Sequence, residues 1–242
     1  MMKDENKTKE QLINEMTEMR LKIAELEKSE TERIQTEEAL SQLIEKLRRS
    51  AGFIIDVAVM AVEARDPYIA GHQKRVAELA RSIATEMKLY TEIIDGIRMA
   101  GLIHDLGKIS IPSEILGKPR LLNNDEYNLV KTHTEIGYQI LKDIDFFSPV
   151  ALIVYQHHER MNGTGYPQGL RGTEILLESR ILAVADVVEA ICTHRPYRPE
   201  LGIDKALKEI FQHSGVLYDT EVVNVCIQLF REKGFSFKSR SN

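Results

Sequence analysis

Histidines and aspartates occur in short polar motifs that could hold divalent metal ions. Two of the motifs are pairs: His104-Asp105 follows one apolar segment, and His157-His158 closes another. Polar pairs at the ends of core-facing helices are costly to bury unless something binds them. Imidazoles and carboxylates suit divalent iron, manganese, zinc or nickel, and neighbouring helices can each direct one or two ligands inward. The pairs therefore indicate a metal centre.

Three further residues, His72, His133 and Asp186, stand in polar contexts that could complete such a centre. Each has a simpler explanation, because a single histidine on a helix is more often a surface residue or a satisfied core residue than a ligand. The two adjacent pairs favour the metal interpretation for the whole set.

The segments that would position these residues are expected to be helices. After residue 52, apolar residues recur at helical spacing almost throughout, and no segment alternates convincingly with a period of two. We therefore predict an all-α fold, with irregular stretches containing Gly and Pro at 110–123 and 161–173. Helices are expected over residues 53–65, 73–88, 91–105, 125–142, 148–158, 178–194, 203–213 and 221–232.

Residues 1–50 differ in composition from the rest of the chain, since they contain no Gly, Pro or aromatic residue. We place a boundary near residues 50–52, which gives a helical segment at 1–50 and a globular domain at 51–242. One alternative for the segment is a single solvated helix. We favour a parallel dimeric coiled coil, because so polar a helix gains little stability alone. Its apolar seam is interrupted by Glu30, Arg33 and Glu37, and comprises Leu12, Met16, Met19, Ile23, Leu26, Leu40, Ile44 and Leu47.

Charge and composition narrow the classes of partner. The net charge is −5, so the chain lacks the general basic field that drives binding to nucleic acid polymers, and an anionic substrate must meet local positive charge. The two cysteines, Cys192 and Cys226, cannot build a disulfide framework and favour a reducing compartment. The charged N-terminus does not resemble a secretory signal, and the longest apolar runs, of about six residues, are too short to span a bilayer. We expect a soluble, cytoplasmic protein.

Five ordered blocks of the sequence resemble the HD-GYP family of the HD phosphohydrolase superfamily. GLIHDLGK at 101–108 is similar to the superfamily signature, and HHERMNGTGYP at 157–167 is similar to the extended HD-GYP signature. The resemblance covers about residues 53–235 and implies an HD-type helical bundle. The other three blocks are RDPYIAGHQKRVAELA at 65–80, HTEIGYQIL at 133–141 and ADVVEAICTHRPYRP at 185–199.

The resemblance implies two divalent metal ions, with iron or manganese favoured, and a bridging role for Asp105. A carboxylate has two oxygens, which suits a bridge, and two metals can polarise a phosphodiester and activate water. One metal would be held by His72, His104, Asp105 and Asp186, and the other by Asp105, His133, His157 and His158.

The resemblance also implies residues that meet the substrate. Asp105 and Lys108 would be catalytic, with Lys108 donating to the scissile phosphate and its developing charge; a solvated lysine is the alternative. Arg195 and Arg198 would bind substrate phosphate, although they could instead interact with a helix C-terminus. The substrate loop would contain Gly165, Tyr166 and Pro167.

Three departures from the family pattern matter. Tyr68 stands where some relatives carry a Glu that holds a third metal, so two metals are expected. Thr193-His194 replaces a common Ser-Asp, which adds an imidazole on the substrate side that we do not expect to be a ligand. Met161 and Asn162 replace a frequent Trp and Asp and remove no ligand.

The activity implied by the resemblance is hydrolysis of cyclic di-GMP to linear pGpG, with further cleavage to GMP left open, in bacterial second-messenger signalling. A hybrid cyclic GMP-AMP substrate is not distinguished by the sequence. One alternative, a non-catalytic docking module, is disfavoured by the complete ligand set. Another, hydrolysis of a nucleoside triphosphate or guanosine alarmone, is disfavoured by the GYP loop and the arginine pair. The coiled coil would form a homodimer and could connect to a sensor or signalling partner.

Overall fold

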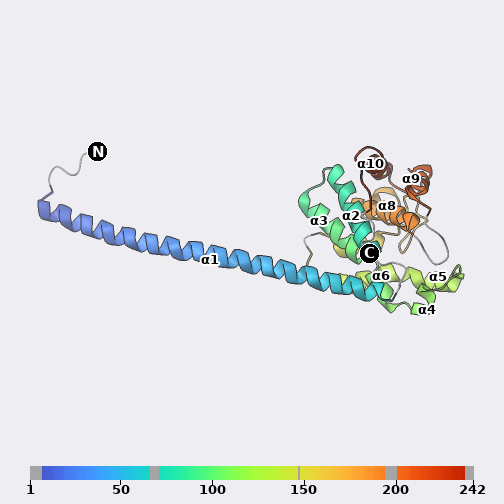
Figure 1. Cartoon of the computed structure of the whole chain (residues 1–242), viewed down its shortest axis with the longest axis horizontal. Coiled ribbons are helices and arrows are strands. Elements are labelled where there is room, and N and C mark those ends of the chain that lie inside the picture. The colour runs from blue at the N-terminus through green and yellow to red at the C-terminus, as the bar shows by residue number, and fades with distance from the viewer. Residues whose placement is uncertain (1–6, 66–70, 147, 194–200, 238–242) are drawn as a thin grey trace. The chain divides into compact units, whose positions relative to one another are not determined.

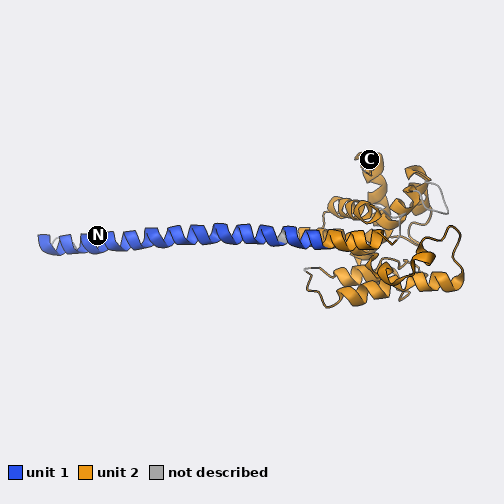
Figure 2. Ribbon diagram, turned by 60° about the horizontal axis from the view of Figure 1, so that its bottom comes forward, with its two compact units in different colours: residues 1–54 blue, residues 55–242 orange. Residues whose placement is uncertain are grey.

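The computed structural model of the 242-residue chain describes residues 7–65, 71–146, 148–193 and 201–237. The chain divides into two compact units, residues 1–54 and 55–242, which Figure 2 distinguishes by colour. The division falls inside the first helix, α1, which runs without a break over Lys9–Glu63. The helices expected at 1–50 and 53–65 are therefore one element, and Gly52 is an exposed residue within it.

The first unit consists of the greater part of α1. A capping box precedes this helix: the Thr8 hydroxyl accepts from the Gln11 amide at 3.3 Å, and the Gln11 side chain accepts from the Thr8 amide at 2.9 Å. Arg33 forms ion pairs one turn away on both sides, with Glu30 and Glu37. All eight apolar residues of the predicted seam are exposed in the single chain.

The second unit is built from helices, and no strand is assigned among the residues that the structure describes, which confirms the predicted all-α class. No helix in these parts of the chain is both long enough and apolar enough to cross a bilayer. Beyond α1, the elements are α2 (His72–Glu86), α3 (Thr91–Ile103), η1 (Leu106–Ser110), α4 (Ser113–Leu116), α5 (Asn124–Lys131), α6 (His133–Leu141), α7 (Val150–Gln156), η2 (Gly172–Glu174), α8 (Leu177–Cys192), α9 (Ile203–Gln212) and α10 (Thr220–Arg231).

The core of the second unit lies around α2, α3 and α8, which Figure 1 shows close together. Helix α8 is buried around most of its circumference, as its nearly continuous apolar sequence requires. Helix α6 packs against α7 and against the 3₁₀ helix η1, so the four segments that carry the histidine motifs meet near one another.

The helix expected over 125–142 is two helices, α5 and α6, separated at Thr132. The Thr132 hydroxyl donates to the Leu129 carbonyl at 2.7 Å, and the Thr132 amide donates to the same oxygen at 3.1 Å. These bonds replace the regular pattern with a tighter turn at the end of α5. The prediction of one continuous helix was wrong because apolar spacing does not register such a local turn.

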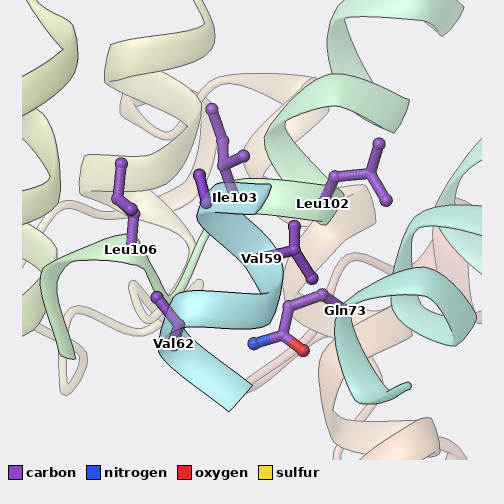
Figure 3. A pocket seen from close by; sticks show the side chains of 7 residues that line it. Val59, Val62, Gln73, Leu102, Ile103 and Leu106 are labelled. Carbon is purple, nitrogen blue, oxygen red and sulfur yellow. The ribbon is translucent and has the colours of Figure 1, made fainter. Parts of the chain in front are cut away.

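The last turns of α1 pack against the segment that leads into His104. Figure 3 shows Val59 and Val62 facing Leu102, Ile103 and Leu106 across a narrow apolar gap. The Gln73 side chain borders the same gap, is 1% exposed, and has no hydrogen-bond partner for either of its amide atoms among the described residues. A buried amide without partners destabilises the fold.

Candidate metal centre

Seven side chains converge inside the second unit. His72 begins α2, His133 begins α6, and Asp186 lies on α8. The two pairs follow helix ends: one comes after α3 and the other after α7. All of these residues are buried except His158, which is partly exposed. The seven are the predicted ligands His72, His104, Asp105, His133, His157, His158 and Asp186.

The seven side chains form two groups on either side of Asp105. In one group, ligand atoms of His72, His104 and Asp186 lie within 4.8 Å of one another, and in the other the same holds for His133, His157 and His158. The Asp105 Oδ2 atom lies 3.6 Å from His104 Nε2 and 3.9 Å from His72 Nε2. The Asp105 Oδ1 atom lies 3.6 Å from His133 Nε2. Each carboxylate oxygen therefore faces a different group.

Three imidazole rings are fixed in the orientation that presents Nε2 to the centre. The Nδ1 atoms of His104, His133 and His157 lie 2.8, 2.7 and 2.6 Å from backbone carbonyl oxygens three residues earlier, so Nδ1 carries the proton and Nε2 a lone pair. The acceptor carbonyls belong to Gly101, Val130 and Val154.

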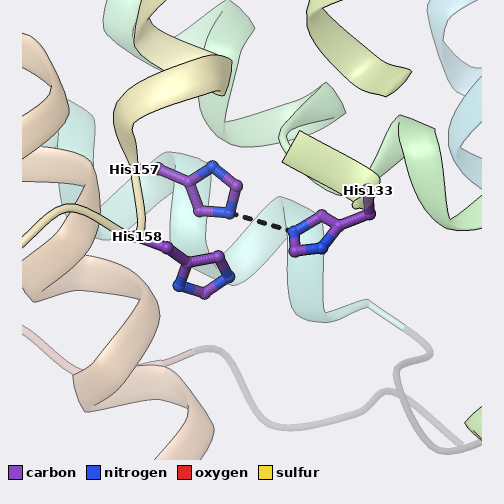
Figure 4. Close-up of side chains that lie close together, drawn as sticks. All are labelled: His133, His157 and His158. Carbon is purple, nitrogen blue, oxygen red and sulfur yellow. Dashed lines mark hydrogen bonds between the residues drawn. The ribbon is translucent and has the colours of Figure 1, made fainter. Parts of the chain in front are cut away.

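The inward-facing nitrogens lack partners of their own. His104 Nε2 is buried without a hydrogen-bond partner among the described residues. His133 Nε2 and His157 Nε2, which the dashed line in Figure 4 joins, lie 3.5 Å apart. Because both rings donate from Nδ1, two lone pairs face each other across this contact and cannot form a hydrogen bond. Divalent cations, one at each group, would satisfy all three nitrogens, so the residues fit the metals that the sequence implies.

Three of the histidines and both aspartates have titration states that suit metal ligands. Burial lowers the pKa of His133 to about 4 and holds the pKa values of His157 and His158 well below the usual range, so these rings are neutral. Burial opposes the charge of Asp105, but the Lys108 ammonium and the surrounding histidines together outweigh burial and hold the pKa of this carboxyl well below its usual range. Burial likewise opposes the charge of Asp186, and the hydrogen bond from His72 keeps its pKa low.

His72 is oriented by a residue that the sequence analysis did not identify. Its Nδ1 atom contacts Glu189 Oε2, and its Nε2 atom lies 3.3 Å from Asp186 Oδ1. The other Glu189 oxygen accepts from Arg75 Nε at 2.7 Å. Burial opposes the positive charge of His72, but hydrogen bonds to Asp186 and Glu189 raise its pKa to about 9. Glu189 follows Asp186 by three residues on α8, and this helical spacing was the available signal.

Lys108 lies over Asp105 because the chain changes helix type between them. Helix α3 ends at Ile103 and η1 follows; in a 3₁₀ helix, side chains three residues apart eclipse each other. Lys108 Nζ is 2.7 Å from Asp105 Oδ2. A Cβ at Gly107 would lie 1.9 Å from the His133 carbonyl oxygen, so only glycine lets η1 approach α6 this closely.

The predicted substrate loop folds against His158. The Tyr166 ring lies 4.7 Å from the His158 ring, centroid to centroid, with the planes 30° apart. A Cβ at Gly165 would lie 2.4 Å from Glu159 Cα, which explains the glycine, and Pro167 is exposed. Glu159, which the sequence analysis also missed, is buried and accepts hydrogen bonds from the amides of residues 168, 169 and 170 at 2.7, 3.1 and 3.0 Å.

Four residues named from the sequence lie outside the described parts of the chain. They are Arg195 and Arg198, expected to bind phosphate, together with Tyr68 and His194.

Comparisons with known proteins agree with this architecture. The family model for the HD domain matches residues 56–222. The chain is similar to the cyclic di-GMP phosphodiesterase response regulator RpfG of Xanthomonas campestris, with 40% identity over 170 residues, 69% of this chain and 45% of that protein. It is also similar to 3'3'-cGAMP-specific phosphodiesterase 3 of Vibrio cholerae, with 38% identity over 160 residues, 66% of this chain and 35% of that protein. The chain thus spans less than half the length of both relatives.

Among solved structures, an HDG"Y"P protein from Bdellovibrio bacteriovorus, Bd1817, shares the fold. Its TM-score is 0.59 at 20% identity, and the match covers 76% of this chain and 64% of that one.

Proposed function

Because this chain belongs to the HD domain family, we propose that it is a metal-dependent phosphodiesterase that opens cyclic di-GMP. The observation that carries the proposal is the pair of buried histidine groups that share one carboxylate, Asp105. The names of relatives matched at 40% and 38% identity support a cyclic dinucleotide as the substrate class.

The proposed ligands divide as the two groups do. His72, His104 and Asp186 would hold one divalent ion, His133, His157 and His158 the other, and Asp105 would bridge them. Iron and manganese are the favoured ions, since imidazole and carboxylate ligands suit both. Two bound ions would supply Lewis acidity toward a phosphoryl oxygen and toward water.

The residues around the ligands have distinct proposed roles. Lys108 would move from Asp105 Oδ2 to a phosphoryl oxygen of the substrate, where its ammonium offsets the charge that develops as the P–O bond breaks. Glu189 keeps the His72 ring in place through its Nδ1 atom. Tyr166, which stacks on His158, would form one wall of the substrate site, with Gly165 and Pro167 beside it.

The product would be linear pGpG, which still contains a phosphodiester and could be cut again to GMP. Cyclic GMP-AMP is the second candidate substrate, because a relative named as specific for it matches at 38% identity. Arg195 and Arg198 remain proposed phosphate contacts.

We further propose that α1 pairs in parallel with a second copy of itself through the apolar seam, and that a sensor or signalling partner acts through this segment. The exposure of all eight seam residues in the single chain supports pairing. A cytoplasmic location belongs to the same proposal, since two cysteines cannot build a disulfide framework.

The test combines metal analysis of anaerobically purified protein with chromatography of cyclic di-GMP products. The parent should contain about two divalent ions per chain and convert cyclic di-GMP to pGpG. Asp105→Ala should lose the metals and the turnover. His213→Ala is the matched control, because His213 lies outside both histidine groups. Equal losses in the two variants would mean that the histidine groups serve folding rather than metal binding.

A further inference from the structure

A cyclic dinucleotide carries two phosphates, so positive charge is needed at more than one point near the histidine groups. The net charge of the chain is −5, and Lys108 is engaged at Asp105. Lys131 provides a further cation close to the site. It ends α5, two residues before the proposed ligand His133, and is only partly exposed.

Lys131 lies against two aromatic rings. Its Nζ atom is 5.2 Å from the centroid of the Tyr127 ring and 5.8 Å from the centroid of the Tyr166 ring. Tyr166 in turn stacks on His158, so the ammonium is one ring away from the second histidine group. No carboxylate of the described residues lies within ion-pair distance of Lys131, which leaves its charge available to an anion.

The three side chains combine two kinds of recognition. An ammonium is a compact donor that suits a phosphate oxygen, and aromatic faces hold it in place without neutralising it. Tyr127 is 49% exposed, so one part of its ring remains open for stacking with a nucleobase. A mononucleotide phosphodiester whose phosphate lies at the metals would leave this surface unused.

We propose that Tyr127, Lys131 and Tyr166 form a subsite for the part of a cyclic dinucleotide that is not being cleaved. Lys131 binds the second phosphate and Tyr127 stacks on the adjoining base. The inference rests on the proposed function and adds a specificity determinant on α5 to it. A purely structural role for Lys131, as a cation at the C-terminus of α5, would affect stability but not the choice between substrates.

Steady-state kinetics of the metal-loaded full chain separate these roles. Lys131→Ala should raise KM for cyclic di-GMP by about 10- to 100-fold, the range for a lost hydrogen bond to a charged group, with a smaller effect on kcat. Turnover of bis(p-nitrophenyl) phosphate, which has a single phosphate, should stay within about twofold of the parent, because this substrate does not reach the subsite. Lys131→Arg should recover most of the loss, and Tyr127→Leu should raise KM for cyclic di-GMP alone.

Lys142→Ala is the matched control, since Lys142 is an exposed lysine beyond the end of α6. The subsite is overturned if Lys131→Ala has the parent's KM for cyclic di-GMP, or if it loses activity equally on both substrates. Neither result would overturn the proposed function. A metal-loaded parent that cleaves bis(p-nitrophenyl) phosphate but no cyclic dinucleotide overturns the proposed function and, with it, the subsite.

Discussion

Replacing Glu189 with Ala should weaken metal binding although it removes none of the seven proposed ligands. The Glu189 side chain is fully buried and contacts His72 Nδ1, Arg75 Nε and the Thr193 hydroxyl. Without its carboxylate the His72 ring can rotate, and Nε2 no longer points steadily toward Asp186, 3.3 Å away. Loss of such a supporting carboxylate costs about 10- to 100-fold in metal affinity.

The size of the effect should depend on the replacement. Glu189→Gln keeps one oxygen that can accept from His72 Nδ1 but loses the charge, so we expect a loss near tenfold; Glu189→Ala keeps neither and should approach a hundredfold. Competition between the protein and a chromogenic chelator for Mn²⁺ measures the affinity, and circular dichroism checks that each variant is folded. Glu178→Ala, in the first turn of the same helix, is the control. If folded Glu189→Ala binds Mn²⁺ as tightly as the control, Glu189 does not position the metal site.

Four further outcomes are expected. Lys108→Ala should retain its metals but lower kcat for cyclic di-GMP by about 10²–10³-fold, and normal turnover would exclude the phosphate role. The pKa of His72 is about 9 in the metal-free chain, so metal binding at pH 7 should release close to one proton from His72. The metal affinity should therefore increase as the pH rises toward 9, and calorimetry in buffers of different ionisation enthalpy should detect the released proton. Gln73→Leu should stabilise the fold by about 1–3 kcal/mol in thermal or urea unfolding, whereas Gln139→Leu on the surface should not. Sedimentation should report a dimer for the full chain and a monomer for Met19→Glu/Ile23→Glu, with Leu21→Glu, an exposed residue off the seam, remaining dimeric.

Most helices of the second unit could be predicted from sequence because they bury apolar residues, whereas α4, in a stretch expected to be irregular, has no buried residue. Helix ends were harder. Thr132 ends α5 through bonds to the Leu129 carbonyl that apolar spacing does not register. The sequence analysis also did not predict that one helix runs from Lys9 to Glu63. Gly52 and a change of composition suggested a boundary there, but neither breaks helical hydrogen bonding.

The proposed ligands could be named from the sequence because they stand in short motifs. The residues that support these ligands could not be named in this way. Glu189 meets His72 across 117 residues of sequence, and only the packing of α8 against α2 brings them together. Glu159 is adjacent to His158 in sequence, but its carboxylate accepts hydrogen bonds from three backbone amides of the loop at residues 168–170, which apolar spacing and motifs do not predict. Sequence motifs therefore indicate which side chains could bind metal or substrate. The side chains and amides that orient them come from other parts of the fold.

The ends of helices orient three of the proposed ligands through contacts that are local in sequence. The last carbonyls of a helix have no partner within it. His104, His133 and His157 each donate Nδ1–H to such a carbonyl three residues earlier, so one hydrogen bond both caps a helix and turns Nε2 toward the centre. His72 is different, because it begins α2 rather than following the end of a helix. Its ring therefore needs an acceptor from elsewhere in the fold, and Glu189 on α8 provides it.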